Sequence, residues 1–229
     1  MSIEIRGLYA ILDWPHRHGL EAEDVAEALI EGGATLLQLR AKQASPSERA
    51  GLLDRLAPIC ARRSVPLFIN DDLELALARG GTPGFAGVHL GQSDLGGLDP
   101  DNRQRLRDLG LLLGISTHTP AQVEAAITDF QPEYIGFGPV FPTASKEGAD
   151  PVVGLEQLRS IFHEPGTGRI PVVAIGGIDV ARAASVAATG VAAMAAIAAL
   201  VAPSREDTIE QTRALAQAFV DGTGPAGPT

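Results

Sequence analysis

The sequence has little of what marks secreted or membrane proteins. Its 229 residues include a single cysteine, Cys60, which excludes an internal disulfide. The richest apolar run, VAAMAAIAALVA, is shorter than the roughly 20 residues that a membrane-spanning helix needs. The opening residues, MSIEIRGLYAIL, lack the basic start and long apolar stretch of a secretory signal. These absences predict a cytoplasmic protein that does not enter a membrane.

Lysine is also scarce. Only Lys42 and Lys146 occur beside 16 arginines, and the formal net charge is -10. This acidic balance argues against nucleic acid as a partner, because nucleic-acid-binding domains carry basic surfaces. Since arginine supplies positive charge everywhere else, the two lysines indicate positions that need a compact ammonium group, as in phosphate binding.

Short apolar runs alternate with longer amphipathic segments along the chain. Two of these segments begin with SPSE (45–48) and TPAQ (119–122), which have the capping-box pattern with proline at the first helical position. Strands are predicted over residues 8–12, 35–40, 66–70, 87–90, 111–116, 134–138, 172–176 and 191–195. Eight such units in a chain near the roughly 250 residues of that architecture predict an α/β fold, a single (β/α)8 TIM barrel.

Other assignments remain open at this level. A doubly wound open sheet also alternates strands with helices, and GVAAMAAIAAL is compatible with a continuous helix instead of a last strand. The barrel is expected to occupy residues 1–220, and the glycine- and proline-rich end (221–229) to form a disordered tail. Arg103, Arg105 and Arg107 are interpreted as the solvated face of a surface helix.

Polar residues gather just after the predicted strands. Active sites of such barrels lie at the carboxyl ends of the strands, so these residues are candidates for one site. Both lysines of the chain belong to the set. Its members are Gln38, Arg40, Lys42, Asn70, Asp71, Gln92, Asp94, Ser116, His118, Thr143, Ser145, Lys146, Gly176 and Gly177.

Two of the acidic residues in this set suit a metal ion. Asp71 and Asp94 follow neighbouring strands and offer hard oxygen ligands, and Mg²⁺ typically takes one or two protein carboxylates together with water and phosphate oxygens. Asp72 begins the next helix and is expected to cap it. The alternative is that Asp71 and Asp72 are both caps.

The cations and glycines of the set suit phosphate groups. Lys42, Lys146 and Arg40 would balance a diphosphate beside the metal, and the amides around Gly177 would bind a second phosphate, although a glycine pair is also a common turn. His118 is expected either to orient its loop or to act as a base. His89 has the setting of a core histidine.

Six segments in order resemble the thiamine phosphate synthase family: QLRAK, FINDD, GVHLGQSDL, GISTHT, YIGFGPVFPTASK and VVAIGGI. They cover the barrel from the second to the seventh strand. The resemblance implies a transferase that joins hydroxymethylpyrimidine diphosphate to hydroxyethylthiazole phosphate, or to its carboxylated precursor. Diphosphate leaves, thiamine phosphate forms, and Mg²⁺ is required.

The resemblance also implies roles for individual residues. Arg40, Lys42 and Lys146 would be the catalytic cations, and Asp71 and Asp94 the metal ligands. The pyrimidine diphosphate would contact Gln38, Arg40, Lys42, Asn70, Ser116 and Lys146. The thiazole phosphate would contact Thr143, Ala144, Ser145, Gly177 and the backbone of Met194 and Ala195.

Three departures from the family pattern accompany the match. Ala41 replaces a usual glutamate, the pair Ala144 and Ser145 replaces the usual residue and threonine, and Ala195 replaces a common serine.

Two other functions compete with the synthase: a thiazole tautomerase that uses a histidine at the position of His118, and a non-catalytic phosphate-binding barrel. The sequence is compatible with a homo-oligomer but does not define the oligomeric state.

Overall fold

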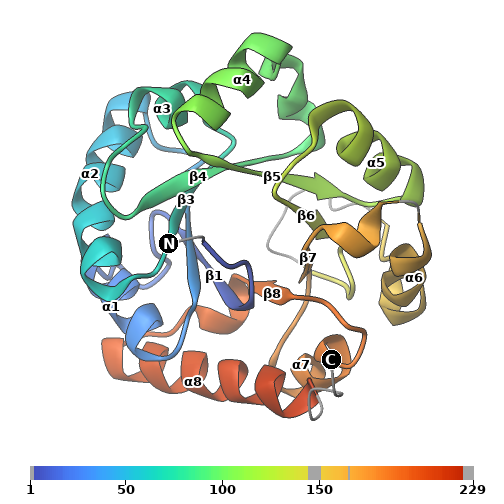
Figure 1. Ribbon diagram of the computed structural model, residues 1–229. Helices are drawn as coiled ribbons and strands as arrows, with labels where there is room; N and C mark the ends of the chain where they lie inside the picture. The colour runs from blue at the N-terminus through green and yellow to red at the C-terminus, as the bar shows by residue number, and fades with distance from the viewer. Residues whose placement is uncertain (1–2, 144–150, 165, 224–229) are drawn as a thin grey trace.

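The computed structural model is a closed barrel of eight parallel strands surrounded by helices (Figure 1). It describes residues 3–143, 151–164 and 166–223. Each strand pairs with its neighbours in chain order, and β1 pairs with β8 to close the ring. The strands are β1 Gly7–Asp13, β2 Leu36–Arg40, β3 Leu67–Asn70, β4 Phe85–Leu90, β5 Leu112–Thr117, β6 Tyr134–Phe137, β7 Val172–Ile175 and β8 Ala193–Ala196.

Helices connect successive strands along the outside of the barrel. The α-helices are α1 Ala22–Glu31, α2 Pro46–Arg63, α3 Leu73–Ala78, α4 Pro100–Asp108, α5 Pro120–Ala125, α6 Gly154–Ser160, α7 Val180–Ala187 and α8 Arg205–Gly222. Shorter helical turns are η1 Gln92–Gly97, η2 Ala126–Phe130, η3 Ile161–His163, η4 Thr167–Arg169 and η5 Ala198–Leu200. Within the described residues, no helix combines the length and apolar character needed to cross a membrane.

The predicted architecture is confirmed, with small differences at the element ends. All eight predicted strands form, and their ends agree to within two residues. The open-sheet alternative is wrong because β1 pairs with both β2 and β8. The segment read alternatively as a continuous helix contains β8 followed by the short turn η5. At the other end α8 extends through Gly222, two residues beyond the expected end of the barrel, and residues 224–229 lie outside the described part.

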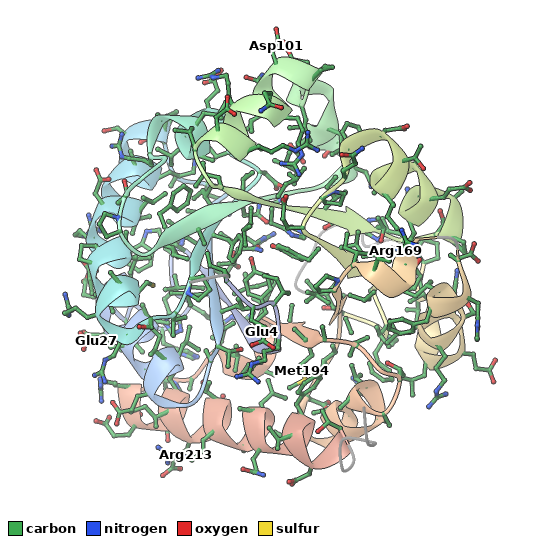
Figure 2. All side chains as sticks on the ribbon, in the orientation of Figure 1. Glu4, Glu27, Asp101, Arg169, Met194 and Arg213 are labelled. Atoms are coloured by element: carbon green, nitrogen blue, oxygen red, sulfur yellow. The ribbon has the colours of Figure 1, made fainter. Side chains whose placement is uncertain are left out.

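Two apolar clusters stabilise the barrel. The larger one fills the layer between the strands and the helices, and charged residues such as Asp101 and Arg213 project outward beyond it (Figure 2). The second, the interior cluster, lies inside the barrel. It consists of Ile5, Tyr9, Ile11, Leu36, Phe68, Ala86, Tyr134, Val173, Ala193 and Ala195. Strand side chains alternate between the two clusters because successive residues of a strand face opposite sides.

The two predicted capping boxes differ in detail. Ser45 and Glu48 at the start of α2 exchange both bonds of the motif, as expected. At α5 the Thr119 hydroxyl accepts from the amide of Gln122, but the Gln122 side chain accepts from the amide of His118 instead of Thr119. This second cap therefore also fixes the backbone at His118.

Arg103 corrects the interpretation of the three arginines on α4 as one solvated face. Its side chain is buried, donates to the carbonyl oxygens of Phe130 and Gln131, and forms an ion pair with Glu133 at 2.8 Å. Glu133 in turn accepts from the amide of Leu113 on β5 at 2.7 Å. Arg103 thus joins α4 to the segment before β6, whereas Arg105 and Arg107 lie on the exposed side as predicted.

Replacing Arg103 with methionine should destabilise the protein, because it leaves Glu133 and two carbonyl groups without their donor. We expect the free energy of unfolding to fall by about 3 kcal/mol in urea denaturation. Arg105→Met, on the exposed side of α4, is the control and should change it by less than about 0.5 kcal/mol. Equal losses in both variants would contradict the structural role of Arg103.

Candidate active site

A cavity of about 420 Å³ opens at the carboxyl ends of the strands. Its wall combines residues from every strand of the barrel or from the loops that follow them. Thirteen of the residues proposed from the sequence line it: Gln38, Arg40, Lys42, Asn70, Asp71, Gln92, Asp94, Ser116, His118, Thr143, Gly176, Gly177 and Ala195.

Four other proposed residues do not appear in this wall. Met194 is buried on β8 and packs into the outer cluster, so its side chain faces the helices and not the cavity. Ala144, Ser145 and Lys146 lie outside the described residues.

The two proposed metal ligands both lie close to Gly91, the residue that follows β4. A Cβ atom built on Gly91 would lie 2.9 Å from Asp94 Oδ2 and 3.6 Å from Asp71 Oδ1. The Gly91 amide donates to Asp71 Oδ1 at 3.1 Å. Asp71 has φ of 59°, a left-handed conformation that aspartate tolerates better than most residues. Both carboxylates are therefore neighbours of the same backbone position at the cavity rim.

This arrangement fits Mg²⁺ in its donor chemistry. Two hard carboxylates face one cavity, which leaves the remaining coordination positions to water and substrate oxygens. The described residues contain no group of three or more His, Cys, Asp or Glu side chains placed to hold a metal ion.

Asp72 has the structural role predicted for it. Its side chain accepts from the amide of Leu75 at 3.0 Å as the cap of α3, and it forms an ion pair with Arg49 at 2.7 Å. The adjacent residues Asp71 and Asp72 thus have different roles. Asp71 faces the cavity, and Asp72 joins α3 to α2.

The cations of the cavity are held by carboxylates. Lys42 lies 3.4 Å from Asp71 Oδ2, with half of its side chain exposed to solvent. Arg40 pairs with Asp13 at the end of β1. Sequence reasoning missed Asp13, although its place directly after an apolar strand is the same signal that identified Asp71.

The cavity has one polar half and one apolar half. The half formed by β2 to β5 carries Arg40, Lys42, Asp71 and Asp94, whereas residues from β7 and β8, including Ile175 and Ala195, form an apolar wall opposite. The described residues place no cation in this apolar wall. The two halves therefore suit ligands of different chemistry.

The glycine pair after β7 allows two loops to pack closely. A Cβ at Gly176 would lie 2.4 Å from Pro139 Cβ, and one at Gly177 would lie 2.5 Å from the carbonyl oxygen of Pro142. Both glycines have positive φ values, and Arg182 donates to the Gly177 carbonyl oxygen at 2.6 Å. The pair brings the loops after β6 and β7 together at the cavity.

Sequence reasoning missed the two tyrosines in the floor of the cavity and expected His89 only as a core histidine. Tyr9, Tyr134 and His89 lie inside the barrel, and their polar atoms bond to one another and to the cavity residues Gln38 and Ser116. The two tyrosines, the only ones in the chain, are each buried to 1% exposure or less. The sequence signal that could have revealed these tyrosines was Gly114 on β5, because a glycine inside a strand often marks a site where another group packs closely against the backbone. A Cβ there would lie 2.1 Å from Tyr134 Cζ.

Burial shifts the acid–base behaviour of these groups. It lowers the pKa of His89 to about 4, against the opposing effect of the Asp71 carboxylate, and it raises the pKa of both tyrosines. His89 is thus a neutral, fully hydrogen-bonded histidine at neutral pH, as the sequence indicated.

His118 lines the cavity beside the loop after β6. Its Nδ1 lies 2.6 Å from the carbonyl oxygen of Gly138. A carbonyl oxygen only accepts, so Nδ1 carries a proton. This bond orients His118, and an imidazole protonated at Nδ1 is compatible with both roles considered for it.

The pKa of His89 predicts a pH-dependent stability. Because the unfolded chain binds this proton more tightly than the folded chain, the free energy of unfolding should fall as pH decreases from about 6.5 to about 4. The slope from one group is at most about 1.4 kcal/mol per pH unit. Urea denaturation of the wild type and of His89→Gln across this range should show the component only in the wild type. The same slope in both would contradict the assignment.

Comparison with known proteins identifies relatives of this chain. The family model described as thiamine monophosphate synthase matches residues 8–200. The thiamine-phosphate synthase of Levilactobacillus brevis is 36% identical and covers 88% of this chain and 89% of its own. That of Methanocella arvoryzae is also 36% identical, covering 91% and 92%. The solved thiamine phosphate pyrophosphorylase from Pyrococcus furiosus aligns with a TM-score of 0.76 at 33% identity, covering 96% and 98%. The chain belongs to the thiamine monophosphate synthase family.

Proposed function

We propose that this protein is a thiamine phosphate synthase. It joins hydroxymethylpyrimidine diphosphate to hydroxyethylthiazole phosphate and releases diphosphate. With the carboxylated precursor of the thiazole, carbon dioxide is released as well. The observation that carries the proposal is the divided cavity, in which Arg40, Lys42, Asp71 and Asp94 face an apolar wall. A diphosphate suits the charged half, and a thiazole ring suits the other.

The charged half is suited to the leaving diphosphate. Asp71 and Asp94 would hold Mg²⁺, which would neutralise charge on the diphosphate oxygens. Lys42 and Arg40 contribute two further positive charges, and Asn70 and Ser116 are placed at the same end of the cavity. Lys146, in the segment after β6, is the third cation of this proposal.

The chemistry needs charge stabilisation more than a general base. The aminopyrimidine ring stabilises a cation at its methylene carbon, so the bond to diphosphate breaks first and the thiazole nitrogen then captures that carbon. Cations that gather around the departing diphosphate favour this transition state over bound substrate. The cavity contributes by holding the two rings next to each other and by excluding water.

The thiazole phosphate would occupy the apolar half. Its ring would lie against Ile175 and Ala195, and its phosphate would bind amides at Gly177 together with Thr143. The next two residues of the sequence, Ala144 and Ser145, belong to the same proposal. The alanine at position 195 leaves an apolar surface where a serine would offer a hydroxyl. Ala41 packs into the outer cluster, so its departure from the family pattern does not touch the cavity.

The tautomerase alternative uses only part of this cavity. It requires His118 as a base and gives no role to Lys42, Asp71 or Asp94, which all line the same space. The phosphate-binding alternative predicts ligand binding without turnover. Incubating the protein with both substrates and Mg²⁺, and following thiamine phosphate and diphosphate together, separates the three functions. Equal amounts of both products support the synthase, and their absence overturns it.

Asp71→Asn should lower turnover by about 100-fold or more, because it removes one of the two charges proposed to hold Mg²⁺. The asparagine keeps the left-handed backbone, so the fold should be retained. Asp72→Ser is the matched control at the next position. It keeps a helix cap and should retain turnover to within about three-fold. Steady-state kinetics over a range of Mg²⁺ concentrations provide the measurement, and equal effects in the two variants would mean that the acids were assigned wrongly.

Lys42→Arg should lower turnover by about 10-fold, although it keeps the positive charge. The planar guanidinium is wider than an ammonium and directs its donors differently, so it fits poorly beside Asp71 and a diphosphate. The KM for the thiazole phosphate should stay within about two-fold of wild type, since that ligand occupies the other half. Varying each substrate in turn tests this, and full turnover by the arginine variant would show that a generic charge suffices.

A further inference from the structure

A continuous chain of hydrogen bonds crosses the barrel beneath the cavity. The Gln38 amide Nε2 donates to the Tyr9 hydroxyl at 3.1 Å, and the two tyrosine hydroxyl oxygens are 2.9 Å apart. The Tyr134 hydroxyl lies 3.0 Å from His89 Nδ1, and His89 Nε2 lies 2.9 Å from Ser116 Oγ. Both ends of the chain, Gln38 and Ser116, line the cavity, so we call it the interior relay.

The interior relay has one consistent direction once the Gln38 amide is set. An amide nitrogen only donates, so the single Tyr9 proton points to Tyr134, and the Tyr134 proton points to His89 Nδ1. Neutral His89 then carries its one N–H at Nε2 and donates it to Ser116 Oγ. The Ser116 hydroxyl can then donate its own proton to a ligand in the cavity, and the Gln38 carbonyl oxygen can accept a hydrogen bond there.

Exchanging the amide nitrogen and oxygen of Gln38 reverses the donor and the acceptor in every hydrogen bond of the interior relay. If the Gln38 carbonyl oxygen faced Tyr9, each hydroxyl and the imidazole would have to donate in the opposite sense, and the Ser116 proton would point inward to His89. The two ends of the interior relay therefore always have opposite polarity: one offers a donor to the cavity while the other offers an acceptor. Burial enforces this coupling, because a broken link leaves a polar group without a partner in the core.

We propose that the interior relay selects the pyrimidine substrate by its hydrogen-bonding pattern, with Tyr9, Tyr134 and His89 as positioning residues. This inference rests on the proposed function. When Gln38 Nε2 donates to Tyr9, the cavity matches a ring that offers an amino N–H to the Gln38 carbonyl oxygen and an unprotonated ring nitrogen to the Ser116 hydroxyl. An aminopyrimidine has both groups. An analogue with an oxo group in place of the amino group offers an acceptor to Gln38, and accommodating it requires the whole relay to reverse.

The packing of the barrel supports a relay of this rigidity. The His89 and Tyr134 rings stack with centroids 5.5 Å apart, and the rings of Tyr9 and Phe68 each contact the Tyr134 ring. A Cβ at Gly114 would lie 2.6 Å from His89 Nδ1, and one at Gly136 would lie 3.3 Å from His89 Cε1. Two missing side chains thus make room for the relay, and its rings have no space to turn.

The first test measures the proton on His89 directly. Long-range nitrogen-15 correlation NMR of the wild-type protein should show His89 as the Nε2–H form, with its signals assigned by their loss in His89→Gln. A ring protonated at Nδ1 overturns the proposed direction, whether or not the protein makes thiamine phosphate. The wild-type spectrum decides the outcome, and the His89→Gln variant serves only to assign the signals.

The second test breaks the interior relay with Tyr134→Phe, which removes only the central hydroxyl. Calorimetric Kd values for hydroxymethylpyrimidine diphosphate and its oxo analogue, with Mg²⁺, should differ by about 100-fold or more in the wild type. The difference should shrink by about 10-fold or more in the variant, because Gln38 can then turn over without reversing Ser116. The His89 signals should also lose their single tautomer.

The control for this variant is Thr117→Val. It removes another buried hydroxyl, which donates to the Gly136 carbonyl oxygen at 2.9 Å next to Ser116, and it should leave the ratio of the two Kd values unchanged. An undiminished ratio in Tyr134→Phe overturns the selection mechanism. Failure of the wild type to form thiamine phosphate, together with amino-selective binding and the Nε2–H form, would instead contradict the proposed function alone.

Discussion

The absence of a side chain at Gly114 determines what the barrel can hold. A Cβ atom at this position would lie 2.1 Å from Tyr134 Cζ, so only glycine lets the tyrosine ring enter the barrel. That ring then packs against Phe68 and stacks on His89, which bonds to Ser116 at the cavity. The depth and the polarity of the cavity floor both follow from this single close contact between β5 and β6.

The rim of the cavity depends in the same way on one backbone conformation. The left-handed turn at Asp71 sends its carboxylate back toward Gly91, while the next residue, Asp72, faces outward to cap α3. Two adjacent acids in a regular strand would also point to opposite sides, but neither would approach β4. The turn therefore converts a repulsive pair into one cavity ligand and one structural cap.

The sequence predicted the barrel and most of its rim because both depend on local patterns. Apolar runs of strand length, separated by capped helices, define the fold, and the polar residue after each run meets the others wherever parallel strands end together. The contacts of the interior residues could not be predicted from such local patterns. Tyr9 and Tyr134 look like apolar strand residues until their hydroxyls are seen to meet, and Arg103 looks exposed until Glu133 is placed beside it. Such pairings join distant parts of the chain and leave no local pattern.

Closure of the ring by β1 and β8 has a consequence for how the protein folds. This pairing joins the first and last strands of the chain, and the interior cluster likewise combines Tyr9 with Ala195. Contacts between residues so far apart in sequence form slowly, because loop closure must be completed before they add stability. A chain still emerging from the ribosome has neither the last strand nor a complete cavity. Substrate can therefore stabilise only the finished barrel, and it acts on the closed state as a whole.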